Sequence, residues 1–284
     1  MRIFSNFKKI MDMLTILVPI DFSATSKNAA KFATDMAGRQ PGSRLIFFHL
    51  FDPIAAGSDG TPLDIDINTR KEVVLMGMQN LAREVGAPAD TSLVAESGVF
   101  LIDNLASFVQ QEGVDFVVMG LTGASALDHI LMGSNALRMA NEAVSPVLVV
   151  PPDASFKGLQ TVVFTTDMKD VRISTPINQL KAFLSLQHPT LHVLHVGASN
   201  YEKDPAYTKE KADLQEMLAG FNPQFHFIHE SDFVEAADAF ARTHAVDCII
   251  TVPRHHSFIE SIFVPHYTRR LAYHTHIPLL AIHE

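Results

Sequence analysis

Short apolar runs alternate along the chain with longer stretches in which apolar residues recur every three or four positions. In the first half, the apolar runs predict strands at 15–20, 45–50, 91–96, 114–119 and 146–150. Because these runs are continuous rather than alternating, they are typical of parallel strands that are covered on both faces. The stretches between them predict helices, three of which end at a glycine that is expected to form a left-handed turn, namely Gly38, Gly86 and Gly113.

An internal repeat covers most of the chain. The run ILVPIDFS at 16–23 aligns with VVFTTDMK at 162–169, which places Asp21 on Asp167, and the same offset places His49 on His195. Further along, residues 115–150 align without a gap with residues 247–282. The offset differs between these matches because the first half has a longer insert around 52–70. A repeat of this kind indicates two similar structural units.

Strands that alternate with helices form a parallel sheet with right-handed crossovers. The sequence therefore predicts an α/β fold with two tandem Rossmann-like domains, each an open five-stranded parallel sheet flanked by helices. We expect a leader at 1–12, a first domain at 13–152 and a second domain at 153–284. The last strands, PVLVV and PLLAI, would be exposed sheet edges unless they were paired. We expect them to join the halves as an intramolecular pseudo-dimer about an approximate two-fold axis; a homodimer of whole chains is a further option.

Composition narrows the class of protein. The 284 residues are 47% hydrophobic and 19% charged, as in ordinary globular proteins. The net charge of -9 argues against a nucleic-acid binder and against attachment to an anionic membrane surface. Neither a transmembrane run nor a signal peptide is recognised in the sequence. The one cysteine, Cys248 in VDCIIT, is expected to be a buried, inert thiol, which fits the reducing cytoplasm.

Three separated segments are expected to meet at one edge of the first sheet, since parallel sheets bind ligands beyond the carboxyl ends of their strands. These strands end at Pro19-Ile20-Asp21, His49-Leu50 and Met119-Gly120. The stretch GLTGASALDHILMGS at 120–134 then leads to Ser134, the expected N-cap of the next helix. Glycines before a helix N-terminus leave N–H groups free to bind phosphate. The pattern predicts a mononucleotide pocket, with Asp21 on the ribose, Leu50 and Met119 near the base, and residues 120–134 on the phosphates.

A plainer interpretation of the same residues is structural. Gly120 and Gly123 can serve as turn residues, and Asp21 can cap a helix. We favour the ligand site because three segments that are distant in sequence converge on one crevice.

The opening strand ILVPIDFS, the spacing G-x2-G-x9-G-[S/T] and the ending SPVLVVP resemble the universal stress protein family. The resemblance covers the chain as a tandem of two such domains, with the adenine nucleotide alpha hydrolase-like form of the Rossmann fold. It implies binding of ATP, alone or as its Mg²⁺ complex, or of another adenine nucleotide. The contacts that it implies are Pro19, Ile20, Asp21, Leu50, Met119, Gly120, Gly123, Gly133, Ser134 and Asn135. Ala136 departs from the family, in which a hydroxyl side chain is frequent here, and this affects one phosphate contact.

The second half lacks this loop pattern. The alignment replaces Gly120, Gly123, Gly133 and Ser134 by Val252, His255, Pro265 and His266. Side chains with a Cβ resist positive φ angles, and proline has no N–H, so we expect the second half to keep the fold but not to bind ATP.

Two patterns in the sequence resemble metal-binding sites without completing one. The second half holds twelve of the fourteen histidines, among them His192, His195, His226, His229, His255, His256, His266, His274 and His276. Without an H-E-x-x-H motif or a cysteine pair, no metal site is predicted. The stretch DIDIN at 64–68 resembles an EF-hand start, but Thr69 and Leu75 occupy the positions that require Gly and Glu, so a solvated loop is expected.

The function expected from these observations is that of a cytoplasmic, ATP-binding stress protein with a regulatory role. No catalytic residues are predicted, because no general base, activating lysine or Mg²⁺-binding carboxylate pair is recognised around the pocket. Two alternatives remain open at this point. One is a slow ATPase or nucleotidyl-transfer enzyme on the same scaffold, and the other is a scaffold that binds no nucleotide.

Overall fold

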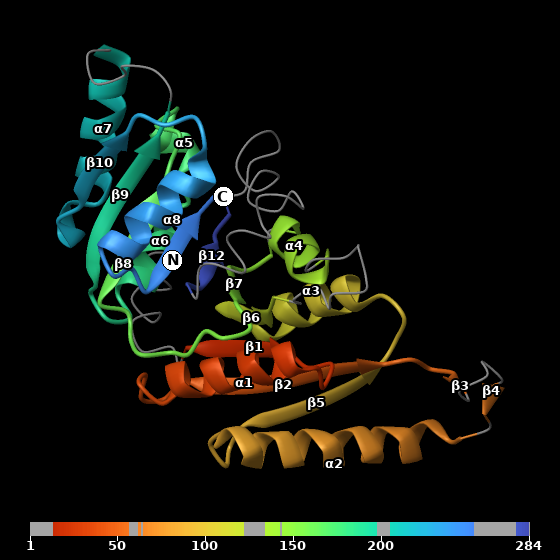
Figure 1. Cartoon of the computed structure of the whole chain (residues 1–284). Coiled ribbons are helices and arrows are strands. Elements are labelled where there is room, and N and C mark those ends of the chain that lie inside the picture. The colour runs from red at the N-terminus through yellow and green to blue at the C-terminus, as the bar shows by residue number, and fades with distance from the viewer. Residues whose placement is uncertain are drawn as a thin grey trace, which may run out of the picture.

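The computed structural model of the protein describes residues 14–56, 62–63, 65–121, 134–142, 144–197, 205–252 and 277–283 (Figure 1). Within these ranges, the core is one ten-stranded sheet with the order β10-β9-β8-β11-β12-β7-β6-β1-β2-β5. The first half contributes β1 (Thr15–Pro19), β2 (Arg44–Phe51), β5 (Ser92–Ser97), β6 (Phe116–Gly120) and β7 (Val147–Val150). The second half contributes β8 (Thr161–Thr165), β9 (Thr190–Val196), β10 (Gln224–Ile228), β11 (Cys248–Thr251) and β12 (Leu279–Ala281). The five strands of each half are mutually parallel, as predicted.

The two halves meet at the seam between β7 and β12. These strands pair antiparallel, so that Leu148 lies opposite Leu280. The prediction that the last strands pair is therefore confirmed. The sequence predicts one five-stranded parallel sheet in each half, and the pairing joins the two into one continuous sheet.

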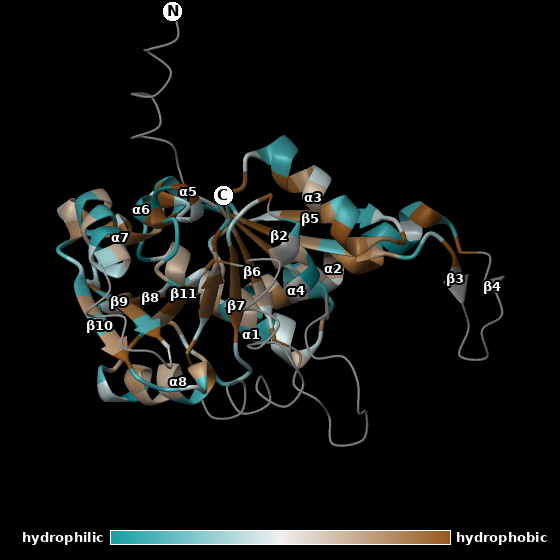
Figure 2. Cartoon of the chain, turned by 90° about the horizontal axis from the view of Figure 1, so that it is seen from above, coloured by the Kyte–Doolittle hydropathy of each residue, from teal (hydrophilic) through white to brown (hydrophobic). Residues whose placement is uncertain are grey.

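Helices cover both faces of this sheet. One face carries α1 (Ala24–Ala37) and α2 (Ile67–Val85) from the first half, and α5 (Val171–Ser174), α6 (Ile177–Leu184) and α7 (Pro205–Met217) from the second. Their apolar residues form one cluster that spans both halves. The other face carries α3 (Leu101–Glu112) and α4 (Ser134–Asn141) over one cluster, and α8 (Phe233–Thr243) over another. Figure 2 shows the hydrophobic strands between these layers, with the hairpin of β3 (Ala55–Ala56) and β4 (Pro62–Leu63) away from the body.

Two of the three predicted left-handed glycines are confirmed. Gly86 and Gly113 end α2 and α3 with φ angles of 72° and 62°. The prediction for Gly38 is wrong, because this residue is right-handed with φ at -61°, and the left-handed turn follows at Gly42, with φ at 82°. The chain makes one further short turn after α1 before it enters β2.

Within the acidic stretch at 64–68, a helix begins at Ile67. Asp66 is the N-cap of α2, and its carboxylate accepts hydrogen bonds of 3.0 Å from the backbone N–H groups of Asn68 and Thr69. The expectation of a solvated loop is therefore wrong from Ile67 onward, because a well-placed Asp satisfies the free donors of a first helical turn.

Hydrogen bonds repeat between the halves as the sequence does. A carboxylate oxygen of Asp115 accepts from the Thr15 N–H at 2.9 Å, and Asp247 accepts from the Thr161 N–H at the same distance. The second aspartate and threonine align with the first pair in the internal repeat. Each bond ties the first residue of one strand, β1 or β8, to the aspartate that directly precedes the adjacent strand, β6 or β11.

The helix equivalent to α1 is broken in the second half. Its counterpart consists of the short α5 and the separate α6, with Thr175 and Pro176 between them. Proline lacks the N–H for a helical hydrogen bond and clashes with the preceding turn, which explains the break. None of the helices in the described ranges has the length and apolar character needed to cross a membrane.

We expect substitutions in the seam to destabilise the whole sheet. Leu148 and Leu280 are 2% and 0% exposed, so Leu280→Ala should lower the free energy of unfolding by about 2–5 kcal/mol, as in other cores. Ile173→Ala is the control, since Ile173 is 77% exposed and should change stability by less than about 0.5 kcal/mol. Urea unfolding measures both, and equal small effects would contradict the role of the seam.

Candidate functional site

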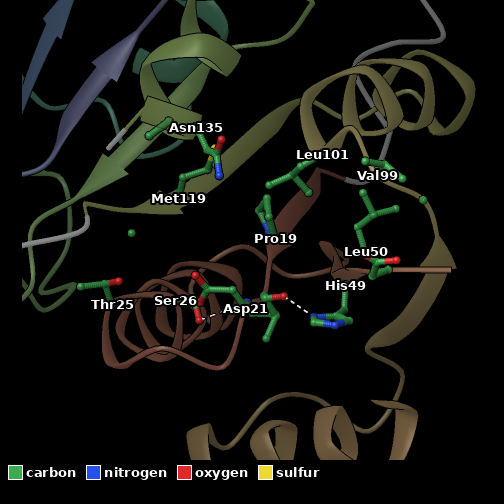
Figure 3. Close-up of a pocket in the computed structure, with 15 residues that line it drawn as sticks. Pro19, Asp21, Thr25, Ser26, His49, Leu50, Val99, Leu101, Met119 and Asn135 are labelled. Carbon is green, nitrogen blue, oxygen red and sulfur yellow. Dashed lines mark hydrogen bonds between the residues drawn. The ribbon is translucent and has the colours of Figure 1, made fainter. Parts of the chain in front are cut away.

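A cavity of about 350 Å³ lies beyond the carboxyl ends of β1, β2 and β6 (Figure 3). Seven of the ten residues predicted to bind a ligand line it, namely Pro19, Ile20, Asp21, Leu50, Met119, Gly120 and Asn135. Gly123 and Gly133 lie outside the described residues, and so does the side chain of Ser134. The backbone at Ser134 begins α4, as expected. The structure therefore brings together the described part of the predicted site.

The carboxylate of Asp21 is exposed at the rim and is held by a local turn. Its Oδ1 accepts hydrogen bonds from the N–H of Ser23 at 2.9 Å and from the Ser23 hydroxyl at 2.5 Å. Partial burial raises the pKa of Asp21, but hydrogen bonds from Ser23 and Ser26 outweigh burial and leave the pKa below its ordinary value. The carboxylate is therefore ionised at neutral pH. The expected cap role belongs to Ser23, the N-cap of α1, rather than to Asp21.

Packing against α1 requires a glycine at position 120. A Cβ added at Gly120 would overlap the carbonyl oxygen of Thr25 and lie 2.6 Å from the carbonyl carbon of the same residue. The end of β6 thus approaches the first turn of α1 more closely than any side chain permits. The plainer interpretation of Gly120 as a turn residue is therefore wrong, because Gly120 ends β6 and the close approach to α1 is what requires a glycine. The same contact also brings Thr25 and Ser26 to the cavity wall.

A histidine fixes the loop that carries Asp21. The Nδ1 of His49 donates to the carbonyl oxygen of Ile20 at 2.6 Å (Figure 3). In the second half, the Nδ1 of His195 donates to the carbonyl oxygen of Thr166 at 2.9 Å. Because this histidine–carbonyl hydrogen bond occurs in both halves, we interpret it as a structural feature of the fold and not as part of a ligand site.

Sequence reasoning missed several parts of the cavity. The residues that it did not place there are Thr25, Ser26, Asp52, Gly98, Val99 and Leu101. His49 was expected at the crevice and Ala136 beside a phosphate, but neither was predicted as a ligand contact. Gly98, Val99 and Leu101 follow β5, whose carboxyl end lies beside that of β2 in the sheet. A strand order derived from the predicted crossovers could have found them, and the N-cap at Ser23 could have pointed to Thr25 and Ser26.

The equivalent place in the second half is nearly closed. Among the described residues, the cavity there measures about 10 Å³ and is lined by Asp167, Thr175 and Val252, among others. Val252, which lines it, replaces Gly120 in the repeat, so the side-chain atoms that Gly120 lacks are present there.

Three of the second-half histidines form a cluster beside α8. The Nδ1 of His192 and the Nε2 of His226 are 2.8 Å apart, and the ring of His244 lies 5.0 Å from that of His192. At this distance one nitrogen donates a hydrogen bond to the other. No group of three or more potential metal ligands is found among the described residues. His255, His256, His266, His274 and His276 lie outside the described ranges, as does Pro265.

Comparison with known proteins agrees with this fold. Residues 13–151 match the universal stress protein family. Over 140 residues the chain is 29% identical to a universal stress protein of Methanocaldococcus jannaschii, which covers 48% of this chain and 80% of the relative. A universal stress protein of Thermus aquaticus is 28% identical over 147 residues, covering 48% of this chain and 97% of that protein. A crystal structure of a universal stress protein from Archaeoglobus fulgidus covers 95% of this chain and 98% of its own, with a TM-score of 0.66 and 16% identity.

A mostly parallel sheet with a cavity at its strand ends defines a Rossmann-like α/β protein. The domain at 13–151 belongs to the universal stress protein family. The Archaeoglobus fulgidus structure shows in addition that the fold of nearly the whole chain, second half included, occurs in a protein of that name.

Stability should fall in acid because of the histidine cluster. Burial lowers the pKa of His192, as do the neighbouring His226 and His244; burial and His244 lower the pKa of His226. The folded chain therefore binds fewer protons than the unfolded chain as the pH falls below the ordinary value of 6.5. The stability present above this pH should be lost progressively below it, by at most about 1.4 kcal/mol per pH unit for each histidine.

The variant that tests this is His226→Phe, which keeps an aromatic ring beside Phe240. Urea unfolding between about pH 5.5 and 7.5 should show a shallower dependence on pH in His226→Phe than in the unmodified chain. His188→Asn is the control, since His188 is exposed and its positive φ suits asparagine. A slope that His226→Phe leaves unchanged would contradict the role of the cluster.

The close approach at Gly120 should make this position intolerant of alanine. Gly120→Ala should lower the free energy of unfolding by about 1–3 kcal/mol, since the added atom forces β6 and α1 apart. Gly220→Ala is a matched control, because a Cβ at Gly220 would meet nothing within 4 Å. Thermal unfolding of both variants gives the comparison. If they were equally stable, α1 would not be packed against β6 as described.

Proposed function

We propose that the first half of the chain binds an adenine nucleotide, and specifically ATP, the ligand that the family resemblance implies. The chain would then be a regulatory binding protein of the cytoplasmic stress response. The proposal rests above all on one observation. Residues from three strand ends and from the start of α4 converge on one cavity, and they are the residues that the family pattern assigns to nucleotide contacts. The family match covers this half.

The lining suits the nucleoside part of such a ligand. Leu50, Leu101 and the largely buried Met119 offer an apolar wall for a base. Across the cavity, Asp21 presents an ionised carboxylate, a good acceptor for the two hydroxyl groups of a ribose. The N-terminus of α4, at Ser134 and Asn135, would face a phosphate with its free N–H groups and the positive end of its dipole.

The role that we propose is binding rather than turnover. Phosphoryl-transfer sites use lysine or arginine to stabilise the charge that develops on the transferred group. Neither residue type is present among the described residues that line the cavity. The near-closure of the equivalent place in the second half supports one nucleotide site per chain.

Calorimetry with ATP and Mg²⁺ should give a stoichiometry near one per chain. Asp21→Ala should weaken binding by about 10- to 150-fold, since a hydrogen bond to a charged group contributes about 1.5–3 kcal/mol. Asp167→Ala is the matched control in the second half and should have little effect. Asp21→Asn keeps an oxygen that can accept from Ser23, so it separates loss of the ribose contact from loss of the local turn.

Two results would contradict this assignment. One is a second, equivalent site in the unmodified chain. The other is an equal loss of affinity in Asp21→Ala and Asp167→Ala, because the two halves would then bind alike.

A further inference from the structure

The segment that joins the two halves, residues 151–160, has neither a helix nor a strand of its own. This segment, the connector, follows β7 and ends where β8 begins. Ala154, Phe156 and Leu159 within it are nevertheless buried. A flexible linker between domains would be exposed and make few contacts. The connector is therefore held in place, and its contacts show what holds it.

One face of α1 holds the connector. The Asn28 amide donates to the carbonyl oxygens of Pro151 and Ala154 at 2.9 and 3.1 Å, so both of its hydrogens are used. The ring of Phe32 packs edge-on against that of Phe156, with the ring centroids 5.2 Å apart. Asn28 and Phe32 are one helical turn apart and lie on the same face of α1.

The other side of the same helix start belongs to the cavity. Thr25 and Ser26 line the cavity, and the Thr25 carbonyl occupies the space that Gly120 leaves. The Ser26 hydroxyl accepts a hydrogen bond of 3.4 Å from the Asp21 N–H. Asn28 follows Ser26 by two residues, and such residues point to nearly opposite sides of a helix. The start of α1 therefore lies between the cavity and the connector.

The amide that holds the connector is specific to the first half. The offset that aligns Asp21 with Asp167 aligns Asn28 with Ser174. The hydroxyl of Ser174 donates to the carbonyl oxygen of Lys169, within its own segment, at 2.9 Å. The repeated fold thus forms without an amide at this position, so the Asn28 hydrogen bonds serve the contact between α1 and the connector.

We propose that Asn28 is a positioning residue for the nucleotide site, and that binding in the cavity is thermodynamically linked to docking of the connector on α1. The inference rests on the proposed function, because it concerns the same cavity. In the docked form, Asn28 holds the start of α1, and with it the wall formed by Thr25 and Ser26. A ligand that contacts this wall binds the docked form more tightly, and by reciprocity it holds the connector more firmly. The second half is in this way the part of the chain that responds to an occupied site.

The first test is hydrogen exchange in the unmodified chain, with and without saturating ATP and Mg²⁺. The Ala154 N–H donates to the Pro151 carbonyl at 3.1 Å, so its exchange reports on opening of the connector. ATP should slow this exchange by about 2- to 12-fold, the range that one hydrogen bond contributes. The Phe221 N–H, in the turn before the edge strand β10, is the internal control and should exchange at the same rate in both samples.

Two variants separate this link from a general loosening of the halves. Asn28→Ala should weaken ATP binding in calorimetry by about 2- to 12-fold and should abolish the effect of ATP on Ala154 exchange. Gln40→Ala is the matched control, because the Gln40 amide also donates to a carbonyl of the second half, that of Leu186 at 2.8 Å, but past the far end of α1. Gln40→Ala should leave the affinity for ATP unchanged.

The outcomes distinguish this inference from the proposed function. If ATP binds but does not change Ala154 exchange in the unmodified chain, the link is wrong while nucleotide binding stands, and this result needs no variant to fold. Unchanged affinity in Asn28→Ala would also overturn the link, as would an equal loss in Asn28→Ala and Gln40→Ala. If ATP does not bind to the unmodified chain at all, the proposed function itself is wrong.

Discussion

The cavity depends on one close approach, between the end of β6 at Gly120 and the first turn of α1 at Thr25. Because Gly120 has no Cβ, the first turn of α1 can lie directly against the carboxyl end of β6. This places Thr25, Ser26 and the Asp21 turn on one wall of the cavity. In the second half, Val252 stands at the equivalent position, Pro176 breaks the helix and little space remains among the described residues.

The same helix also holds the two halves together. The Asn28 amide on α1 donates to the carbonyl oxygens of Pro151 and Ala154 at 2.9 and 3.1 Å. Past the other end of α1, the Gln40 amide donates to the carbonyl oxygen of Leu186 at 2.8 Å. The first turn of α1 therefore contacts both the cavity, through Thr25 and Ser26, and the connection between the halves, through Asn28. A movement of this turn would displace that connection.

Much of this structure can be predicted from the sequence, for physical reasons. Continuous apolar runs gave the parallel strands, and the repeat gave the equivalence of Asp115 with Asp247, which the hydrogen bonds bear out. The prediction failed where a local choice depends on contacts distant in sequence. Nothing near Gly38 indicates a right-handed residue there. Gly120 is required by its contact with Thr25, which is nearly a hundred residues away in the sequence. The glycine pattern of the loop therefore suggested a ligand site, although packing against α1 also requires this glycine. Gly98 and Val99 were missed because their place depends on strand order.

The antiparallel seam between β7 and β12 also bears on how such a chain can diverge. Two subunits that met through these strands as separate molecules would have to keep matching surfaces and sufficient concentration, whereas a covalent connection supplies a high effective concentration of each half for the other. Because the seam is antiparallel, the strands of the two halves point their carboxyl ends toward opposite ends of the sheet. A tandem chain can therefore keep the site at the strand ends of one half and remodel the equivalent place in the other.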